Sequence, residues 1–518
     1  MDIFNAMKNT QTVETENGAT MFASSGKSIV DLNFKVPQMR ANAIRGNNSI
    51  NYGFFMDAYD ESPEYALRWL LFSRDIRGGL GEREIFRGLI VEIAKHDLEL
   101  AMKIVKDIPI EEYGRFDDMI AVYPKVNSAI QAIIVENIYN QLREDIALMK
   151  EGKSISLLAK WMPSINTSSK KTRAIANMLC KELQLKPRQY RKLLAKLRKY
   201  LNIVEINLSR KSYDKIDYSA VPSKANIIYR DAFMRHDEER RQKYLDDLSN
   251  GKEKINANAM FLYDIVHNYM NNSHWSYNNV KKEDATLEEL WKAQDKIPMV
   301  ADTLVVRDGS GSMTSPITGN VSAMDVGDSI TIYATENNIG EYKNKFITFS
   351  SKPQVVDFTG CNTLADKLAY LNKYDDCSNT NIEAVFDMVL NTAIKHKYTQ
   401  EELPKQILIV SDIEFDFVAN DVYNYYYEPT PKVDKALFEE LAERYEKNGY
   451  KLPKLVFWNV NSRTNAIPLQ QNELGVILVS GFSKNIFDMV LSTELDPYKA
   501  LIKELDSGRY DIIKEVLR

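Results

Sequence analysis

The chain has 518 residues, of which 44% are hydrophobic and 27% charged, and its formal net charge is −5. This length is too great for one hydrophobic core, so two or three domains are expected, and no apolar run is long enough to cross a bilayer. Three cysteines without a Cys-x-x-Cys pair argue against a disulfide framework or a zinc ribbon. The polar stretch from Met1 to Gly18 matches neither a secretory signal nor a transit peptide, so we expect an intracellular, cytoplasmic protein.

The first part of the chain has helical periodicity and few strand-like runs. We predict a helical domain over residues 1–298. Its predicted helices are Pro63 to Arg74, Glu82 to His96, Leu98 to Val105, Ser128 to Met149, Ser168 to Leu183, Pro187 to Tyr200, Ser223 to His236, Arg240 to Ser249, Ala257 to Met270 and Thr286 to Asp295. Serial helices with short polar connections are typical of a helical-repeat array of the HEAT type.

A glycine-rich turn from Arg74 to Arg83 joins two of these helices. Its arginines and backbone amides could bind phosphate, but a turn between helices also needs glycine for its geometry alone. We favour the structural interpretation.

Positive charge is concentrated between Lys160 and Arg230, where seventeen Lys or Arg stand against four Asp or Glu. On the predicted helix from Pro187 to Tyr200, the cations recur at three- and four-residue spacing, opposite leucines. Such a surface can follow a phosphate backbone, and Trp161, Tyr190 and Tyr200 could stack on bases. We predict that it binds RNA rather than DNA, through Lys170, Lys171, Arg173, Lys186, Arg188, Arg191, Lys192, Lys196, Arg198, Lys199, Arg210 and Lys211. The alternative is a solvated helix face whose cations pair with acidic residues elsewhere in the fold.

Beyond about Met299, apolar strands alternate with helical patterns, which predicts a doubly wound α/β domain over residues 299–518. The predicted strands are Leu304 to Arg307, Lys345 to Phe349, Gln354 to Phe358, Gln406 to Ser411, Lys454 to Asn459 and Gly475 to Ser480.

Asp308, Ser310 and Ser312 follow the first of these strands, in the pattern Asp-x-Ser-x-Ser. Hard oxygen ligands on a loop suit Mg²⁺ or Mn²⁺, and we expect Gly309 and Gly311 to let the backbone turn tightly around the ion. Ordinary helix capping by the two serines is the alternative. The pattern resembles the metal-ion-dependent adhesion site (MIDAS) of von Willebrand factor A (VWA) domains, and this resemblance implies two distal ligands, Thr380 and Asp412.

An aromatic stretch from Val422 to Pro429 follows Asp412 closely. It could form a recognition rim beside the metal, or it could pack onto the domain's own helices. The sequence leaves both open.

The whole chain resembles TROVE-domain proteins of the Ro autoantigen type, and more closely a TROVE-like family with a C-terminal VWA domain from phages, bacteria and eukaryotes. The motifs that carry the likeness are Thr15 to Ala19, Ser73 to Gly79, Arg115 to Asp118, Ala159 to Pro163, Val221 to Ala225 and Ser411 to Asp416. In Ro proteins the helical repeats close into a ring, the VWA domain joins its ends, small structured RNAs bind the basic outer face, and the hole accepts RNA ends. The resemblance implies a ring here, with residues from Thr15 to Val36 close to the sheet domain or the last helices.

These observations together predict a non-enzymatic RNA-binding component of a ribonucleoprotein that binds small noncoding RNA. A protein partner would supply an acidic ligand to the metal in the VWA domain. One alternative is a structural or assembly protein, for instance of a phage particle, that uses the VWA domain for adhesion. A metal-dependent nuclease or phosphatase is less favoured, because no second-metal cluster and no nucleophile beside a general base is apparent.

Overall fold

The structure is a computed structural model that describes residues 12–14, 20–22, 24–257, 260–270, 280–297, 299, 302–349, 353–374, 382–412, 437–461, 476–483, 487, 490 and 496–518. Two short strands, β1 (Thr12–Glu14) and β2 (Thr20–Phe22), pair antiparallel near the N-terminus. Among the described residues, every element from there to Lys292 is helical. No described helix is long and apolar enough to span a membrane.

All ten helices predicted for this region are present. The described helices are α2 (Ser28–Phe34), α3 (Val36–Arg45), α4 (Asn48–Glu61), α5 (Pro63–Arg74), α6 (Arg83–His96), α7 (Leu98–Asp107), α8 (Ile110–Tyr113), α9 (Phe116–Val122), α10 (Ser128–Lys150), α11 (Leu158–Trp161), α12 (Lys170–Glu182), α13 (Pro187–Tyr200), α14 (Val204–Ser209), α15 (Ser223–His236), α16 (Glu238–Ser249), α17 (Leu262–Tyr269) and α18 (Ala285–Lys292).

Seven of the described helices were not among the predicted ones: the short helices α8, α9, α11 and α14, and α2 to α4. Burial explains why α2 and α4 were missed. Every residue of α2 from Ile29 to Phe34 is buried, so no polar face marks its period. In α4 the amide of Asn51 is buried, where it donates to the carbonyl of Met39 at 2.7 Å and accepts from Asn42 at 3.0 Å. A buried polar residue interrupts the periodic pattern of apolar residues from which a helix is predicted.

The second part of the chain forms a six-stranded sheet in the order β10-β9-β8-β3-β6-β7. The strands are β3 (Thr303–Asp308), β6 (Lys345–Phe349), β7 (Val355–Asp357), β8 (Gln406–Ser411), β9 (Lys454–Asn459) and β10 (Val476–Ser480), all parallel except the edge strand β7. Counted along the chain, this order is 3-2-1-4-5-6, the order of doubly wound sheets. The predicted α/β class and its six strands are confirmed.

The described helices of this domain are α19 (Ala323–Glu336), α20 (Leu364–Leu371), α21 (Ile382–His396), α22 (Leu437–Lys447), α24 (Pro497–Leu505) and α25 (Ile513–Val516), with a small hairpin of β4 (Pro316–Thr318) and β5 (Val321–Ser322). All residues of β3 and β8 are buried, which is why these strands read as continuous apolar runs.

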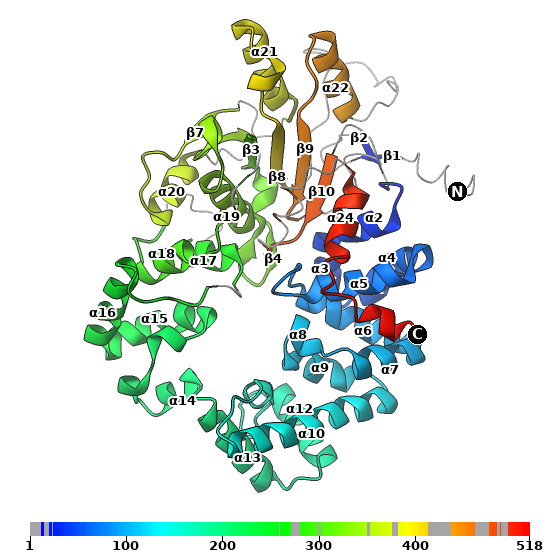
Figure 1. The fold of residues 1–518 in the computed structure, drawn as a ribbon, viewed down its shortest axis with the longest axis vertical. Coiled ribbons are helices and arrows are strands. Elements are labelled where there is room, and N and C mark those ends of the chain that lie inside the picture. Colours follow the sequence, from blue (N-terminus) through cyan, green and yellow to red (C-terminus); the bar gives the residue numbers. More distant parts are fainter. Residues whose placement is uncertain are drawn as a thin grey trace.

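The helices follow one another around a closed loop, and the sheet domain completes it (Figure 1). At one junction α2 lies against the sheet, where Asn459 of β9 donates to the carbonyl of Phe34 at 3.2 Å and Ser480 of β10 donates to that of Asn33. The expected approach of the N-terminal residues to the sheet domain is therefore confirmed for α2. The ring implied by the family resemblance is present as an arrangement of elements.

At the other junction, Glu288 of α18 caps the start of α20. Its carboxylate accepts from the backbone amides of Leu364 at 3.0 Å and Ala365 at 3.1 Å, so a buried negative charge faces the positive end of the helix. Trp291 of α18 donates to Glu336 of α19 at 2.9 Å. The last helices of the array are thus fastened to the sheet domain by polar contacts.

The C-terminal residues return to the first helices (Figure 1). Asp75, fully buried in the turn after α5, accepts from the guanidinium of Arg509 and from the hydroxyl of Tyr510 at 3.1 Å. Arg68 of α5 donates to the carbonyl of Leu505 at 2.8 Å and to Asp511 at 2.6 Å. The last helices therefore hold the sheet domain onto α5.

The glycine-rich turn between α5 and α6 uses its amides internally. Those of Gly79 and Gly81 donate to the carbonyl of Asp75, each at 3.1 Å, and that of Glu82 donates to the carbonyl of Ser73 at 2.7 Å. A Cβ on Gly79 would lie 2.1 Å from the carbonyl oxygen of Phe72, so this position requires glycine. The structural interpretation of these amides is confirmed.

Replacing Arg509 by glutamine should lower the free energy of unfolding by about 3 kcal/mol, because Asp75 would stay buried without its charged partner. Urea unfolding followed by circular dichroism measures this loss. Lys514→Gln is the control, since Lys514 pairs with Asp511 at an exposed site, and it should change stability by less than about 1 kcal/mol. Equal, small losses in the two variants would contradict the role given to Asp75.

Candidate functional site

Asp308, the last residue of β3, links the two central strands of the sheet. Its side chain is fully buried, with Oδ1 accepting from the amide of Ser310 at 2.9 Å and Oδ2 accepting from the hydroxyl of Ser411 at 2.6 Å. Ser411 ends the neighbouring strand β8. Burial raises the pKa of the Asp308 carboxyl, while these hydrogen bonds act in the opposite direction.

The two serines of the motif come together beyond Asp308. The hydroxyls of Ser310 and Ser312 are 2.8 Å apart, at the start of a short 3-10 turn (Gly311–Thr314). Ser310 precedes that turn but makes no capping hydrogen bond through its side chain, so the capping alternative is wrong for this residue. Both hydroxyl oxygens are therefore candidates for binding a ligand.

Asp412 follows β8 directly and is fully buried. Because Arg307 pairs with Val410 in register, Asp308 and Asp412 lie at the same edge of neighbouring parallel strands. These strands, β3 and β8, are the first and fourth in chain order, which is the point where a doubly wound sheet reverses and binds its ligands. Asp308, Ser310 and Ser312 thus lie together, and Asp412 lies at the same edge of the sheet. The fifth predicted ligand, Thr380, lies outside the described residues.

The donors at this edge fit a hard divalent cation, because all are carboxylate or hydroxyl oxygens. The described residues contain no cluster of three or more His, Cys, Asp and Glu that could hold a metal ion, so the candidate site depends on the hydroxyls of Ser310 and Ser312 beside Asp308. The tight-turn reason given for Gly311 is wrong, since its backbone is ordinary and no atom lies within 4 Å of where its Cβ would be. Because Gly311 has no side chain, the space beside the two serines is open.

The aromatic stretch from Val422 to Pro429 lies outside the described residues.

A buried ion pair supports β3 from the other side. Arg307 and Asp328 of α19 are both fully buried, and the guanidinium Nε donates to Oδ1 at 2.9 Å. Successive strand residues point to opposite faces of a sheet. This pair therefore fixes β3 beside Asp308 without reaching the candidate metal-binding loop, Asp308 to Ser312. The sequence signal for it was an arginine inside an otherwise apolar strand.

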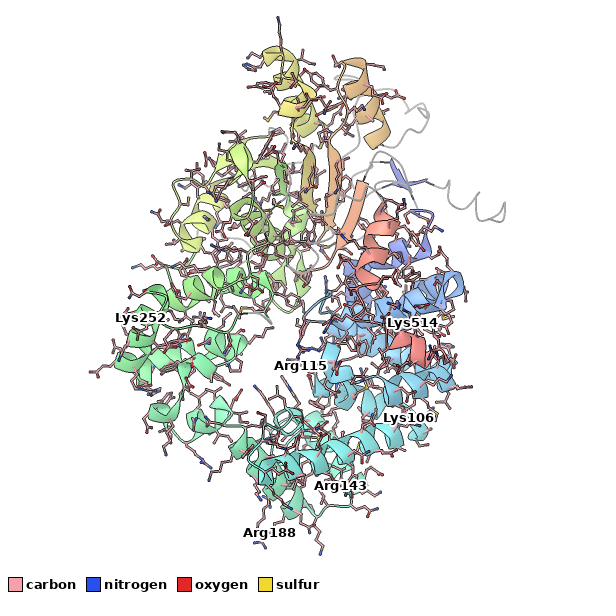
Figure 2. All side chains as sticks on the ribbon, in the orientation of Figure 1. Lys106, Arg115, Arg143, Arg188, Lys252 and Lys514 are labelled. Atoms are coloured by element: carbon pink, nitrogen blue, oxygen red, sulfur yellow. The ribbon has the colours of Figure 1, made fainter. Side chains whose placement is uncertain are left out.

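The basic surface is defined by the predicted RNA-binding residues other than Arg198, and all eleven of them are exposed. They are Lys170, Lys171, Arg173, Lys186, Arg188, Arg191, Lys192, Lys196, Lys199, Arg210 and Lys211. None of them forms an ion pair with a carboxylate in the part of the chain that the structure describes. Figure 2 shows Arg188 at the outer edge of the ring. The alternative of cations neutralised by neighbouring acids is therefore not supported for the described residues.

The local sequence explains the orientation of α13. Pro187 occupies its first turn, and the side chain of Gln189 accepts from the amide of Lys186 at 2.9 Å. Tyr190, Leu194 and Leu197, at helical spacing, are buried, so the cations between them must face outward.

Arg198 and Tyr190 do not belong to the exposed surface. Arg198 donates to the carbonyls of Ala159 at 2.8 Å and Met162 at 2.6 Å and to the hydroxyl of Ser164 at 2.9 Å. Burial lowers the pKa of its guanidinium. Its assignment to RNA is corrected to a structural one, because its donors already bond to α11, which ends at Trp161, and to the residues that follow it. Tyr190 is buried with its hydroxyl on the carbonyl of Pro163, so it cannot stack on a base.

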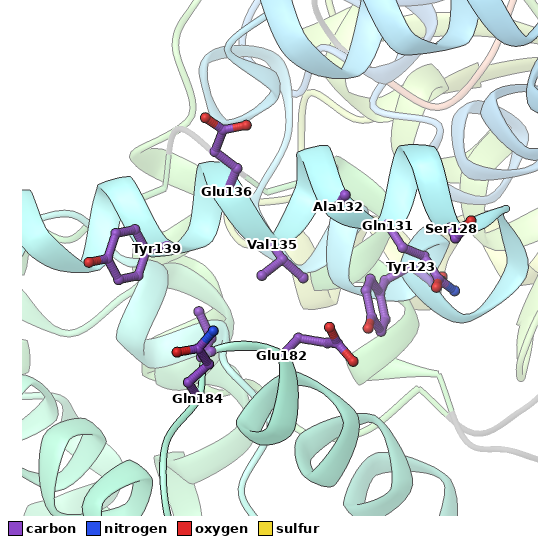
Figure 3. Close-up of a pocket in the computed structure, with 10 residues that line it drawn as sticks. Tyr123, Ser128, Gln131, Ala132, Val135, Glu136, Tyr139, Glu182 and Gln184 are labelled. Atoms are coloured by element: carbon purple, nitrogen blue, oxygen red, sulfur yellow. The ribbon is translucent and has the colours of Figure 1, made fainter.

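A pocket of about 590 Å³ lies between α10 and the end of α12 (Figure 3). Glu136 and Glu182 line it, together with Tyr123 and Tyr139. None of the predicted site residues is among its lining residues, and its two carboxylates would repel phosphate. This pocket is therefore separate from the basic surface.

Comparisons with known proteins match the two parts of the chain separately. Residues 125–297 match a family described as "Domain of unknown function (DUF2828)", and residues 302–509 match "Domain of unknown function (DUF7788)". "Uncharacterized protein L728" of Acanthamoeba polyphaga mimivirus is 29% identical over 530 residues, which cover 95% of this chain and 87% of that protein. The crystal structure of the Deinococcus radiodurans RO (RSR) protein aligns with a TM-score of 0.33 and 11% identity, over 92% of this chain and 93% of the other.

Replacing Asp308 by alanine should abolish Mn²⁺ binding, because it removes the central carboxylate of the loop. Calorimetry with Mn²⁺ and with Mg²⁺ measures the effect, and far-UV circular dichroism should stay nearly unchanged. Asp357→Ala, at an exposed position on the edge strand β7, is the matched control and should bind the ion as the unmodified protein does. Unchanged Mn²⁺ affinity in the Asp308 variant would rule out this site.

Proposed function

We propose that this protein binds RNA as a noncatalytic component of a ribonucleoprotein, with small structured noncoding RNA on the basic surface. The observation that carries the proposal is the set of eleven exposed cations on α12, on α13 and in the turn after α14, which contains Arg210 and Lys211. These cations have no carboxylate partners among the described residues. A phosphate backbone that is neutralised by several exposed cations releases its condensed counterions, and this release favours binding.

The charge distribution and the family resemblance support RNA as the polyanion. The chain carries a net charge of −5, yet residues 160–230 hold seventeen Lys or Arg against four Asp or Glu. Because the protein as a whole is acidic, a local cluster of positive charge favours binding of a polyanion at that cluster over non-specific binding of polyanions across the surface. Tyr200, which is 39% exposed, leaves an aromatic face beside these cations.

The sheet domain has a separate role in this proposal, as a docking site. Asp308, Ser310, Ser312, Thr380 and Asp412 would hold Mg²⁺ or Mn²⁺. Hydroxyl ligands donate little charge, so the bound ion would attract an acidic side chain of a protein partner. Asp308 is held by Ser411 and by the Ser310 amide, which keeps its position independent of the partner.

A second candidate function is structural, in which the metal loop alone mediates assembly. The position of Asp308 and Asp412 at the switch point of the sheet favours it, because this edge can bind an acidic partner whether or not RNA is present. RNA that co-purifies with the protein from its native cell distinguishes the two. Its absence would favour assembly.

Replacing Arg188, Arg191, Lys192, Lys196 and Lys199 by glutamine should weaken RNA binding strongly. Each lost phosphate contact should reduce the slope of log affinity against log salt by about 0.7 to 0.9. Gel shifts at several salt concentrations measure both effects.

The matched control removes the same number of charges from lysines that pair with neighbouring carboxylates. These are Lys95, Lys153, Lys252, Lys292 and Lys514. RNA affinity should change little in this variant, since those charges are already compensated. If both variants lose affinity equally, the basic surface has no special role, and no salt-sensitive binding by the unmodified protein would refute the proposal.

A further inference from the structure

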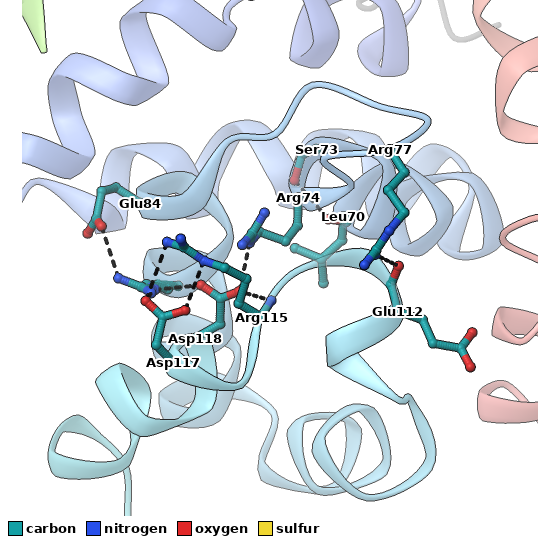
Figure 4. Close-up of polar contacts among 10 residues, drawn as sticks. Leu70, Ser73, Arg74, Arg77, Glu84, Glu112, Arg115, Asp117 and Asp118 are labelled. Atoms are coloured by element: carbon teal, nitrogen blue, oxygen red, sulfur yellow. Dashed lines mark hydrogen bonds and ion pairs between the residues drawn. The ribbon is translucent and has the colours of Figure 1, made fainter. Parts of the chain in front are cut away.

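Four arginines of the first helices lie near one another, away from the basic surface. Arg74 ends α5, Arg83 and Arg87 lie on α6, and Arg115 precedes α9. Figure 2 places Arg115 at the inner edge of the ring, whereas Arg188 lies at its outer edge. Figure 4 shows Arg74 and Arg115 converging on the carboxylates of Asp117 and Asp118.

The nearby carboxylates are already used. Asp118, fully buried, accepts from Arg74 Nε at 2.8 Å, Arg87 Nε at 2.8 Å and the amide of Arg115 at 2.9 Å. Asp117 accepts from Arg87 at 3.0 Å and forms an ion pair with Arg115, whose only hydrogen bond to it within the described residues is long, at 3.5 Å. Four guanidinium groups thus face three carboxylates, because the exposed Glu84 also pairs with Arg87, at 3.2 Å.

Arg83 has no acceptor among the residues that the structure describes. It is half-buried, its Nε is shielded from solvent, and it makes no hydrogen bond or ion pair with any residue that the structure describes. Burial lowers the pKa of Arg115, and repulsion from Arg83 lowers it further. An uncompensated cation held beside others is unfavourable for folding alone, so its placement indicates a ligand.

Arg115 is held in place by an aromatic ring. Its guanidinium lies 4.2 Å from the centre of the Trp161 ring. Arg198 makes three hydrogen bonds to α11, which ends at Trp161, and to the residues that follow it. Its Nε lies 3.1 Å from Asp117 but without hydrogen-bonding geometry. The donors of Arg83 and Arg115 are thus pre-positioned and incompletely used.

We propose that Arg83 and Arg115 form a binding site for a phosphate group. A phosphate group would neutralise the one positive charge by which the four arginines exceed Asp117, Asp118 and Glu84, and guanidinium groups bind tetrahedral oxyanions through paired hydrogen bonds. The site goes beyond the RNA-binding surface, because its residues lie on a different side of the ring and take one phosphate group rather than a phosphate backbone.

Calorimetry with inorganic phosphate at constant ionic strength tests the site in the full chain. Arg83→Gln and Arg115→Gln should each weaken phosphate binding at least tenfold. Arg77→Gln, in the turn before α6, is the matched control, since Arg77 donates to the carbonyl of Glu112 instead, and it should change affinity less than twofold (Figure 4). Phosphate should raise the thermal midpoint of the unmodified protein but not that of Arg83→Gln.

Arg83 has no described partner to lose, so Arg83→Gln should unfold at the same temperature as the unmodified protein, or higher, when phosphate is absent. A marked loss of stability would assign Arg83 a structural role and overturn the proposal, as would phosphate affinity equal to that of the unmodified protein. Competition then identifies the source of the phosphate. Displacement by a 5′-phosphorylated oligonucleotide, but not by its unphosphorylated form, indicates a nucleic-acid end, and displacement by neither indicates a small phosphorylated molecule.

Discussion

The buried carboxylate of Asp75 is the constraint on which the shape of the molecule depends. It lies in the turn between α5 and α6, yet its partners Arg509 and Tyr510 come from the end of the chain. A carboxylate removed from water needs hydrogen-bond donors, and beside the amide of Arg77 the returning C-terminal segment supplies the charged and hydroxyl donors that the structure describes. Closing the loop in this way sets the sheet domain between α2 on one side and α18 on the other. The metal loop and the basic surface then belong to one framework, although they are far apart in sequence.

Arginine has two distinct roles in this protein, and burial separates them. Arg68, Arg241 and Arg307 are fully buried and have acceptors or aromatic faces of the protein itself, so they hold elements together. Arg188 and Arg191 are exposed without described acceptors, which suits an external polyanion. Arg83 combines features of both classes, because it is partly buried and has no acceptor in the described part of the chain. That combination distinguishes it from the basic surface and motivates a phosphate site on the inner side of the ring.

Periodicity predicted most of the fold, because most elements here have a clear period. The continuous apolar runs of β3 and β8 and the leucine stripe of α13 needed no tertiary information. Helices α2 to α4 escaped prediction because buried polar residues such as Asn51 interrupt their patterns. The Asp-x-Ser-x-Ser spacing identified the candidate metal-binding loop from Asp308 to Ser312, but the contact of Ser411 with Asp308 depends on strand order, which the sequence does not encode locally. Arg198 was misassigned for a related reason, since helical spacing places it near the cations but cannot show that three acceptors lie beside it.

The central claim is that RNA lies on the surface formed by α12, α13 and the α14 turn. Crosslinking protein and RNA by ultraviolet light in the native cell, followed by mass spectrometry of the modified peptides, tests it most directly. The account predicts crosslinked peptides within residues 160–230, above all around Tyr200, joined to a limited set of small RNAs. Recovery of no crosslinked RNA, or of RNA joined only to peptides outside this segment, would contradict it.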